Sequence, residues 1–279
     1  YYALCADWTP ERTAEVTGVP ADQIRDTARL LWASRPVSYY AWSGVGQHTN
    51  ATQTDRAISI LYSLLGSIGS SGGNQQPAGV PLNDVSGHEF VTEVQRSKTL
   101  GLQERPLGPP KNGWCTSRDL YHSILEGEPY RVRALLGFGQ NLIISHGGVE
   151  RGIEALKALE FHVHTDIFLT PTASYADIVL PVNTAWERDS LRVGFEITDA
   201  ANGWVQFRHA AVESAGESKD DGWMVFELAK RLGLADAFWG GDMDAAWRDW
   251  LAPRGVELDE LKQNPRGIQL AVETPLAPH

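Results

Sequence analysis

The feature that most constrains the fold is the order of apolar runs between residues 116 and 232. A strand-like run, "VRALLGFG", is followed by a helical segment, "VERGIEALKALE", and then by a second strand-like run, "FHVHTD". A third apolar run lies in "TPTASYADIVLP", and the connections are short. Strands that alternate with helices in this way form parallel sheets with helices packed on their faces. We therefore expect an α/β fold with a Rossmann-like parallel sheet and covering helices.

Residues 1–75 carry a similar pattern in which helices predominate. Thr9 and Pro10 suit the cap and first position of a helix, and further helices are predicted at residues 21–33 and 51–65. The β-branched and aromatic run "VSYYAW" predicts a strand at residues 37–42. We expect this region to be the end of one α/β unit.

Residues 76–115 differ from both flanks in composition. The segments "GSIGSSGGNQQPAGVPLNDVSG" and "TLGLQERPLGPPKNGW" are rich in Gly, Pro, Ser and Asn. Long stretches of this kind are functional loops, linkers or disordered segments. We expect a long irregular loop between the first unit and an α/β domain at residues 116–265, with a loop-like tail at residues 266–279.

Composition excludes several kinds of partner. The 279-residue chain has a formal net charge of −11, whereas binding to nucleic acids or anionic membranes depends on an excess of Lys and Arg. No apolar run is long enough to predict a membrane-spanning helix, and Cys5 and Cys115 are too few for a zinc or iron–sulfur site. We expect no nucleic-acid partner, no direct membrane insertion and no metal ligands. The sequence contains no clear localisation signal, and a cytoplasmic location is slightly favoured over a periplasmic one.

Ligands of open α/β sheets bind beyond the carboxyl ends of the strands, and four loops could occupy such places. In the first of them, "SGVGQHTN", Gly44 and Gly46 let the backbone lie flat against a heterocycle. The neutral groups of Gln47 and His48 suit a ring system rich in donors and acceptors, such as a pterin or a purine. His48 taken alone is more often structural or exposed than catalytic. The second loop is "GSIGSSGGN".

The third loop, "GFGQNLIISHGG", precedes a helix whose free N–H groups favour an anion such as a pyrophosphate. Gly139 permits a close backbone approach, and Asn141 and Ser145 offer neutral polar contacts. An ordinary strand-to-helix turn explains the same residues, and on this loop alone that explanation is preferred.

The fourth loop, "HTDIFLTPTASYAD", is flanked by two aspartates. Asp166 ends one apolar run and Asp177 precedes the next. A carboxylate at such a place can accept two parallel hydrogen bonds from guanine N1–H and N2–H₂, although a turn or a helix cap explains each aspartate singly. His162 and His164 share one face of a strand and are interpreted as structural, because two histidines are too few for a metal site. No nucleophile–base pair or phosphate-binding fingerprint is recognisable, so the catalytic residues are unknown.

In their order, four segments resemble the molybdopterin oxidoreductase family of the dimethyl-sulfoxide-reductase type. They are "TGVPADQIRDTARLLW", "GVGQHTNATQTDRAISILYSLLGSIGSSGGN", "GFGQNLIIS" and "FHVHTDIFLTPTASYADIVLPVNTAWERD". The resemblance runs from about residue 9 to residue 235. It implies molybdenum or tungsten held by two molybdopterin guanine dinucleotides, and electron transfer, often with an oxygen atom, to or from a small-molecule redox substrate.

The resemblance also implies roles for individual residues. The segment Gln47–His48 would approach a pterin and its phosphates, and Asn141 and Ser145 would lie in a loop that contacts one dinucleotide. Asp166 would lie beside that nucleotide, and Asp177 would pair with guanine. The complete set of expected cofactor-binding residues is Gly44, Gly46, Gln47, His48, Gly139, Asn141, Ser145, Asp166, Thr170 and Asp177.

Other parts of the family pattern differ or are missing. The cysteine cluster for an iron–sulfur centre, the segment with the protein ligand to the metal and the C-terminal β-barrel domain are not found, so we expect them elsewhere in a longer subunit. The resemblance thus implies that residues 116–265 form a dinucleotide-binding α/β domain and that residues 266–279 are a linker to a missing C-terminal domain. An arginine typical of the formate-oxidising branch is missing from "NQQPAGVPLN", and Leu142 stands where proline is common. We expect these residues alone to be inactive, and an iron–sulfur electron-transfer subunit is a candidate partner.

Two alternatives remain at this point. One is a scaffold of the same fold in a respiratory complex that has lost its metal. The other is an unrelated nucleotide-binding α/β enzyme, which the absence of a Gly-rich fingerprint disfavours.

Overall fold

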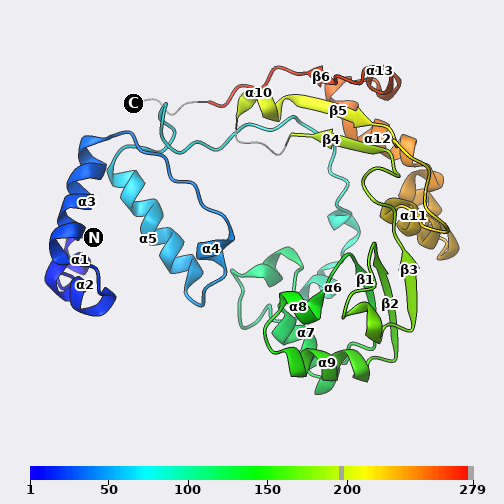
Figure 1. Ribbon diagram of the computed structural model, residues 1–279, viewed down its shortest axis with the longest axis horizontal. Coiled ribbons are helices and arrows are strands. Elements are labelled where there is room, and N and C mark those ends of the chain that lie inside the picture. The colour runs from blue at the N-terminus through cyan, green and yellow to red at the C-terminus, as the bar shows by residue number, and fades with distance from the viewer. Residues whose placement is uncertain (195–197, 276–279) are drawn as a thin grey trace. The chain divides into compact units, whose positions relative to one another are not determined.

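The computed structural model describes residues 1–194 and 198–275, and the chain divides into two compact units (Figure 1). The first unit comprises Tyr1–Val80, Gly194–Trp204 and Gln269–His279. The second comprises Pro81–Val193 and Val205–Ile268. The chain therefore leaves the first unit near Val80 and returns to it twice.

Three parallel strands form the centre of the second unit (Figure 1). β1 (Ala134–Phe138), β2 (Phe161–Asp166) and β3 (Ile178–Pro181) lie side by side in that order, and the register aligns Asp166 with Pro181. The parallel sheet with surrounding helices, predicted from the order of apolar runs, is confirmed. Because the strands are parallel, their carboxyl ends meet at one edge of the sheet.

Helices cover the two faces of this sheet unequally. On one face, α8 (Leu142–Ser145) and α9 (Val149–Ala158) pack an apolar cluster against Leu135 of β1. On the other face, α11 (Asp221–Arg231) borders an apolar cavity of about 390 Å³ that Phe138, Val163 and Leu228 help to line. The sheet is therefore firmly packed only on the side of α8 and α9.

Helix α7 (Ser117–Leu125) completes the packed layer of the second unit. Its residues Tyr121 and Ile124 are almost fully buried and contact Ala155 of α9. Thr116 caps α7 by accepting a hydrogen bond from the backbone N–H of Asp119 at 3.3 Å, as its position in the sequence predicts.

The rest of the second unit follows β3. β4 (Ser190–Val193) pairs antiparallel with β5 (Trp204–Arg208), and β6 (Ile268–Gln269) completes this second sheet. Helix α10 (Asp199–Asn202), which belongs to the first unit, precedes β5. Helices α12 (Met243–Leu251) and α13 (Leu258–Gln263) follow.

Short helices make up most of the first unit. They are α1 (Tyr2–Cys5), α2 (Pro10–Thr17), α3 (Ala21–Ala33), α4 (Ser43–Gly46) and α5 (Ala51–Leu64). The helix predicted at residues 21–33 is confirmed, and Thr9 caps α2 as predicted. No residue of these five helices is buried, so their apolar side chains are only partly covered.

The strand predicted at residues 37–42 is wrong. The backbone N–H of Val37 donates to Ser67 Oγ at 3.1 Å, and the backbone of Tyr39 exchanges two hydrogen bonds with the side chain of Asn74, at 2.7 and 2.9 Å. Side chains of the following loop thus take the place of a partner strand. Gly73 closes this loop, because a Cβ there would lie only 2.0 Å from the carbonyl oxygen of Ser67.

Residues 67–114 are mostly irregular, as their Gly and Pro content predicts. They contain one short α-helix, α6 (Glu93–Ser97), and two 3-10 turns, His88–Phe90 and Pro109–Asn112. Across residues 1–194 and 198–275, every helix is too short or too polar to cross a membrane.

Candidate functional site

A cavity of about 310 Å³ opens at the carboxyl edge of the parallel sheet, beyond the ends of β2 and β3. Four short segments contribute to its wall: the turn after β1, the end of β2, the loop after β3 and the start of α11. The lining residues are Gly139, Asp166, Ile167, Val182, Asn183, Thr184, Ala185, Arg188 and Asp221. This is the edge at which open α/β sheets bind ligands.

Asp166 is the last residue of β2 and places a carboxylate in this cavity. Its Oδ1 accepts the backbone N–H of Phe168 at 3.0 Å, which is the turn that an aspartate favours at a strand end. The side chain is only 11% exposed, so its interactions are weakly screened by water.

Gly139 provides an open backbone beside Asp166. Its φ of 56° is left-handed, and its N–H donates to the carbonyl oxygen of Thr165 at 2.8 Å. Apart from its two chain neighbours, no atom of residues 1–194 and 198–275 lies within 4 Å of the place where a Cβ of Gly139 would be, so a ligand can approach the chain closely here.

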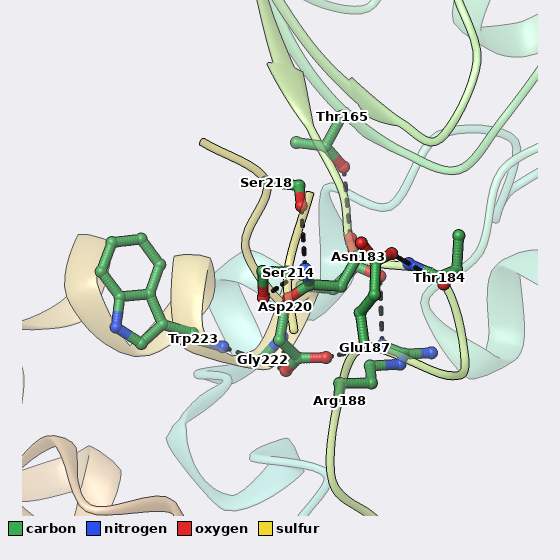
Figure 2. Close-up of polar contacts among 11 residues, drawn as sticks. Thr165, Asn183, Thr184, Glu187, Arg188, Ser214, Ser218, Asp220, Gly222 and Trp223 are labelled. Carbon is green, nitrogen blue, oxygen red and sulfur yellow. Dashed lines mark hydrogen bonds and ion pairs between the residues drawn. The ribbon is translucent and has the colours of Figure 1, made fainter. Parts of the chain in front are cut away.

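The loop after β3 is held by a network of side chains that Figure 2 shows. Asn183 is buried, and its Nδ2 donates to Ser214 Oγ at 3.0 Å and to Ser218 Oγ at 2.9 Å. The backbone N–H and the hydroxyl of Thr184 both donate to Glu187 Oε2, at 2.8 and 2.7 Å. These hydrogen bonds, led by the one from the hydroxyl, lower the pKa of Glu187, so its carboxylate is ionised at neutral pH.

Arg188 connects this loop to the start of α11 (Figure 2). Its Nη1 lies 2.7 Å from Asp220 Oδ2 and 3.6 Å from Asp221 Oδ2. Asp220 also caps α11 by accepting the backbone N–H groups of Gly222 and Trp223, at 2.8 and 3.3 Å. One guanidinium therefore offsets two carboxylates, of which that of Asp221 belongs to a residue lining the cavity.

Thr165 links β2 to the same helix, because its hydroxyl lies 3.4 Å from Asp221 Oδ1 (Figure 2). Thr165 is fully buried. Asp221 is thus held from the strand on one side and from Arg188 on the other.

The structure brings some of the predicted site residues together and separates others. Gly139 and Asp166 line the cavity. In the loops beside them, Asn141 Oδ1 accepts the hydroxyl of Thr172 at 3.0 Å, and Thr170 Oγ1 accepts the backbone N–H of Ala173 at 3.1 Å. These two side chains shape their own loops rather than line the cavity.

Asp177 lies at the opposite end of the sheet from Asp166. It precedes β3, and its Oδ2 accepts the backbone N–H of His162, at the start of β2, at 2.7 Å. Ser145 is the exposed last residue of α8. Neither residue lines the cavity beyond β2 and β3.

The remaining predicted residues belong to the first unit. Gly44 and Gly46 lie in the single turn of α4, and Gln47 and His48 follow it. All four are exposed. Gln47 uses its backbone N–H to close the turn on Ser43, which leaves its side chain open to a ligand.

The sequence-based prediction did not include Asn183, Thr184, Arg188 or Asp221 as site residues. The first three follow the apolar run "IVLP" within a few positions, so the strand-end rule could have found them. Asp221 enters the site from a later helix, and no local pattern signals this.

The model of the molybdopterin oxidoreductase family matches residues 25–231, and the chain belongs to this family of molybdenum and tungsten enzymes. The resemblance found in the sequence is thereby confirmed. The family implies a pterin cofactor that carries molybdenum or tungsten.

Individual relatives are similar to most of this chain. It is 31% identical over 283 residues to dopamine dehydroxylase of Eggerthella lenta, and the alignment covers 94% of this chain and 27% of that protein. It is 30% identical over 253 residues to dimethyl sulfoxide reductase DmsA of Escherichia coli, covering 86% of this chain and 30% of DmsA. The chain thus spans less than a third of either relative.

Among solved structures, acetylene hydratase from Pelobacter acetylenicus has the same fold. The TM-score is 0.80 at 23% identity, and the match covers 95% of this chain and 40% of that one.

The residues at the sheet edge fit the nucleotide end of such a cofactor better than its metal. Among residues 1–194 and 198–275, no group of three or more His, Cys, Asp or Glu side chains could hold a metal ion. The cavity instead offers the Asp166 carboxylate, the open backbone at Gly139 and the guanidinium of Arg188. The buried Nε of Arg188 has no hydrogen-bond partner among the residues that the structure describes. A volume of about 310 Å³ suits a nucleoside-sized group.

Proposed function

We propose that this chain is the central part of the catalytic subunit of a molybdenum- or tungsten-dependent oxidoreductase, and that it binds the guanine dinucleotide form of the pterin cofactor. When bound, the cofactor supplies the redox chemistry of the whole subunit, which is electron transfer and often oxygen-atom transfer. The part played by these residues is to bind and orient the nucleotide end. We also propose a small-molecule redox substrate and an iron–sulfur electron-transfer subunit as partners of the whole protein.

The observation that carries this proposal is the carboxylate of Asp166 in a nucleoside-sized cavity at the carboxyl edge of the sheet. Guanine presents two parallel donors, N1–H and N2–H₂, and a carboxylate offers two parallel acceptors. Hydrogen bonds to a charged acceptor are shorter and stronger than neutral ones. A carboxylate at this edge that is only 11% exposed therefore favours guanine over bases that present an acceptor there.

Asp166 is the better candidate for this pairing than Asp177, which the sequence suggested. Each of the two carboxylates accepts one backbone N–H, but Asp177 lies at the other end of the strands and does not line the cavity that Asp166 lines. The pairing of Asp177 with guanine, which the resemblance implied, is the alternative that the same experiment tests.

The exposed residues of the first unit are proposed for the other end of the cofactor. The side chains of Gln47 and His48, beside the backbone of Gly44 and Gly46, are free to contact a pterin and its phosphates. Asn141, Ser145 and Thr170 are proposed to shape the loops around the dinucleotide.

The test compares Asp166→Asn with Asp177→Asn in the full-length protein. Asparagine replaces one acceptor by a donor, which would face a guanine donor, and such a mismatch costs about 1–3 kcal/mol. We expect Asp166→Asn to lower the molybdenum or tungsten and the GMP released per chain, while Asp177→Asn leaves both unchanged. Metal analysis and chromatography of released nucleotides measure the two quantities.

Normal cofactor content in Asp166→Asn, with the melting temperature unchanged, would refute the proposed role of Asp166. Loss of GMP only in Asp177→Asn would restore the assignment made from the sequence. A wild-type protein that contains neither metal would instead favour a scaffold that has lost its cofactor. The 279 residues by themselves are expected to show no turnover after reconstitution, which electron transfer to a dye measures.

A further inference from the structure

Strand β2 contains two buried imidazoles that the proposed function does not use. His162 is 1% exposed and His164 is fully buried, and their rings meet edge to face with centroids 5.5 Å apart. Within the described residues, no ring nitrogen of either histidine has a hydrogen-bond partner. Buried polar groups without partners are uncommon in native proteins and cost about 1–3 kcal/mol each, so these two call for an explanation.

The two rings differ in what they face. His164 Nε2 lies 3.7 Å from Asp166 Oδ2, because the side chains of residues 164 and 166 point to the same face of the strand. His162 lies deeper, at the start of β2. Burial lowers the pKa of His162, and the neighbouring His164 lowers it further, against weaker opposing effects of Tyr175 and Asp177. His162 is therefore a neutral ring at pH 7, and it is His164 that lies beside the carboxylate of the cavity.

Strand β1 lies against one ring nitrogen of His164 and leaves the other to face Asp166. A Cβ at Gly137 would lie 3.0 Å from His164 Nδ1, so the ring rests against the bare backbone of β1 on that side. A neutral imidazole carries one N–H. Placed on Nε2, that N–H points toward Asp166, which is the nearby group able to accept it.

We propose that His164 is a positioning residue for Asp166 and thereby sets the preference of the cavity for guanine over a base that lacks the second donor. This inference rests on the proposed function, because it concerns the same nucleotide site. The backbone N–H of Phe168 already holds Oδ1 of Asp166 at 3.0 Å. The proposal requires the carboxylate to rotate so that the separation of Oδ2 from His164 Nε2 shortens from 3.7 Å to hydrogen-bond distance.

With both oxygens held, the plane of the carboxylate is fixed, and each oxygen keeps a lone pair for the cavity. Guanine can then donate N1–H to one oxygen and N2–H₂ to the other. Hypoxanthine has the N1–H but lacks the amino group, so it makes only one of the two bonds. Without His164 the carboxylate turns freely about its Cβ–Cγ bond, and the second bond to guanine loses its geometry.

The experiment measures binding of GDP and IDP to the full-length protein purified without its cofactor, by isothermal titration calorimetry. The wild-type protein is expected to bind GDP about tenfold more tightly than IDP, since the bond made only by guanine goes to a charged acceptor. His164→Leu removes the N–H at similar volume and is expected to bring the GDP/IDP ratio to about two or less. His164→Gln keeps a donor and is expected to restore most of the ratio.

His162→Leu is the matched control, because this residue lies on the same strand and face and is equally buried. A purely structural role of the buried histidines would make both leucine variants lower the melting temperature without changing the GDP/IDP ratio. The inference is overturned if His164→Leu keeps the wild-type ratio, if His162→Leu lowers it equally, or if His164→Gln loses it. Where His164→Leu does not fold, the ratio in His164→Gln decides.

Asp166→Asn separates this inference from the proposed function. If that variant binds GDP as the wild type does, the nucleotide site itself is misplaced. If Asp166→Asn loses GDP binding while His164→Leu keeps the wild-type ratio, the site stands and only the role of His164 is wrong.

Discussion

Helix α3 of the first unit and helix α9 of the second both alternate apolar and polar residues at helical spacing, but only α9 buries side chains. Ala155 and Leu156 of α9 are almost completely covered, whereas Leu30 and Trp32 of α3 are 65% and 60% exposed. An amphipathic pattern therefore specifies a helix without specifying a partner for it. The second unit gains stability from its own packing, and the first unit gains little from its helices within this chain.

The sharpest test of this contrast removes one leucine from each unit. Leu156→Ala opens a cavity in the cluster with Leu142 and Ile143, and we expect a loss of about 2–5 kcal/mol in the free energy of unfolding. Leu61→Ala in α5, at a side chain that is 50% exposed, is expected to change it by less than about 1 kcal/mol. Urea unfolding of the two variants measures this difference, and equal losses would contradict the contrast.

The loops of the two units give a second comparison, between glycines. Gly73→Ala forces a Cβ against the carbonyl oxygen of Ser67, and we expect it to destabilise the loop by about 1–3 kcal/mol. Gly139→Ala meets open space and carries only the strain of a left-handed residue, about 1 kcal/mol. Faster hydrogen exchange of the Val37 and Tyr39 amides in Gly73→Ala alone is the expected readout.

Helix caps provide a third comparison of smaller size. Asp220→Ala removes the cap of α11 together with the partner of Arg188, and we expect a loss of about 1–2 kcal/mol. Thr9→Ala removes the cap of α2, a helix with no buried residue, and should reduce helix content locally. Thermal melts followed by circular dichroism test this, and a fall in melting temperature for Thr9→Ala equal to that for Asp220→Ala would count against it.

The smallest expected effect depends on pH. Burial raises the pKa of Asp119, but hydrogen bonds from Arg105 and Thr116 outweigh burial and hold the pKa below its ordinary 3.8. The resulting stabilisation is fully present above about pH 4 and is lost as the pH falls through the lowered value. We expect Arg105→Gln to reduce stability by about 0.5–1 kcal/mol at pH 7 and by less at pH 3.

The matched change in the first unit is Arg25→Gln, which breaks an exposed pair with Glu11. Arg25 also lowers the pKa of Glu11, but both side chains are solvated. We expect no change in the free energy of global unfolding at pH 3 or at pH 7. A loss that is the same at pH 3 and pH 7 in Arg105→Gln would show that the arginine acts through packing rather than charge.

The sequence predicted the parallel sheet of the second unit well, because β1, β2 and β3 follow one another along the chain with short connections and pair in that order. The residues 161–166 form the predicted strand, and β3 begins directly after Asp177. The failure at residues 37–42 has a physical reason. A β-rich composition signals a preference for extended backbone, but a strand also requires a second backbone beside it, and Val37 and Tyr39 meet the side chains of Ser67 and Asn74 instead.

The candidate site was predictable to a similar degree. Asp166 and Gly139 follow strands directly, so the rule for strand ends points to them. Asp221 joins them only through tertiary structure, since Thr165 and Arg188 draw the start of α11 to the sheet. The proximity of His164 to Asp166 was visible in the alternation of β2, but an imidazole in an apolar strand gives no sign of its partner until the strands are placed.

Two neighbouring residues of β2 face carboxylates on opposite sides of the strand. Thr165 reaches Asp221 from one face of the sheet, and His164 faces Asp166 from the other. Inserting or deleting one residue between His164 and Asp166 would place these two residues on opposite faces of the strand and separate them. Insertions in the loops on either side of β2 would spare them. Natural variation in chain length should therefore be found in those loops, and the length of β2 should be invariant.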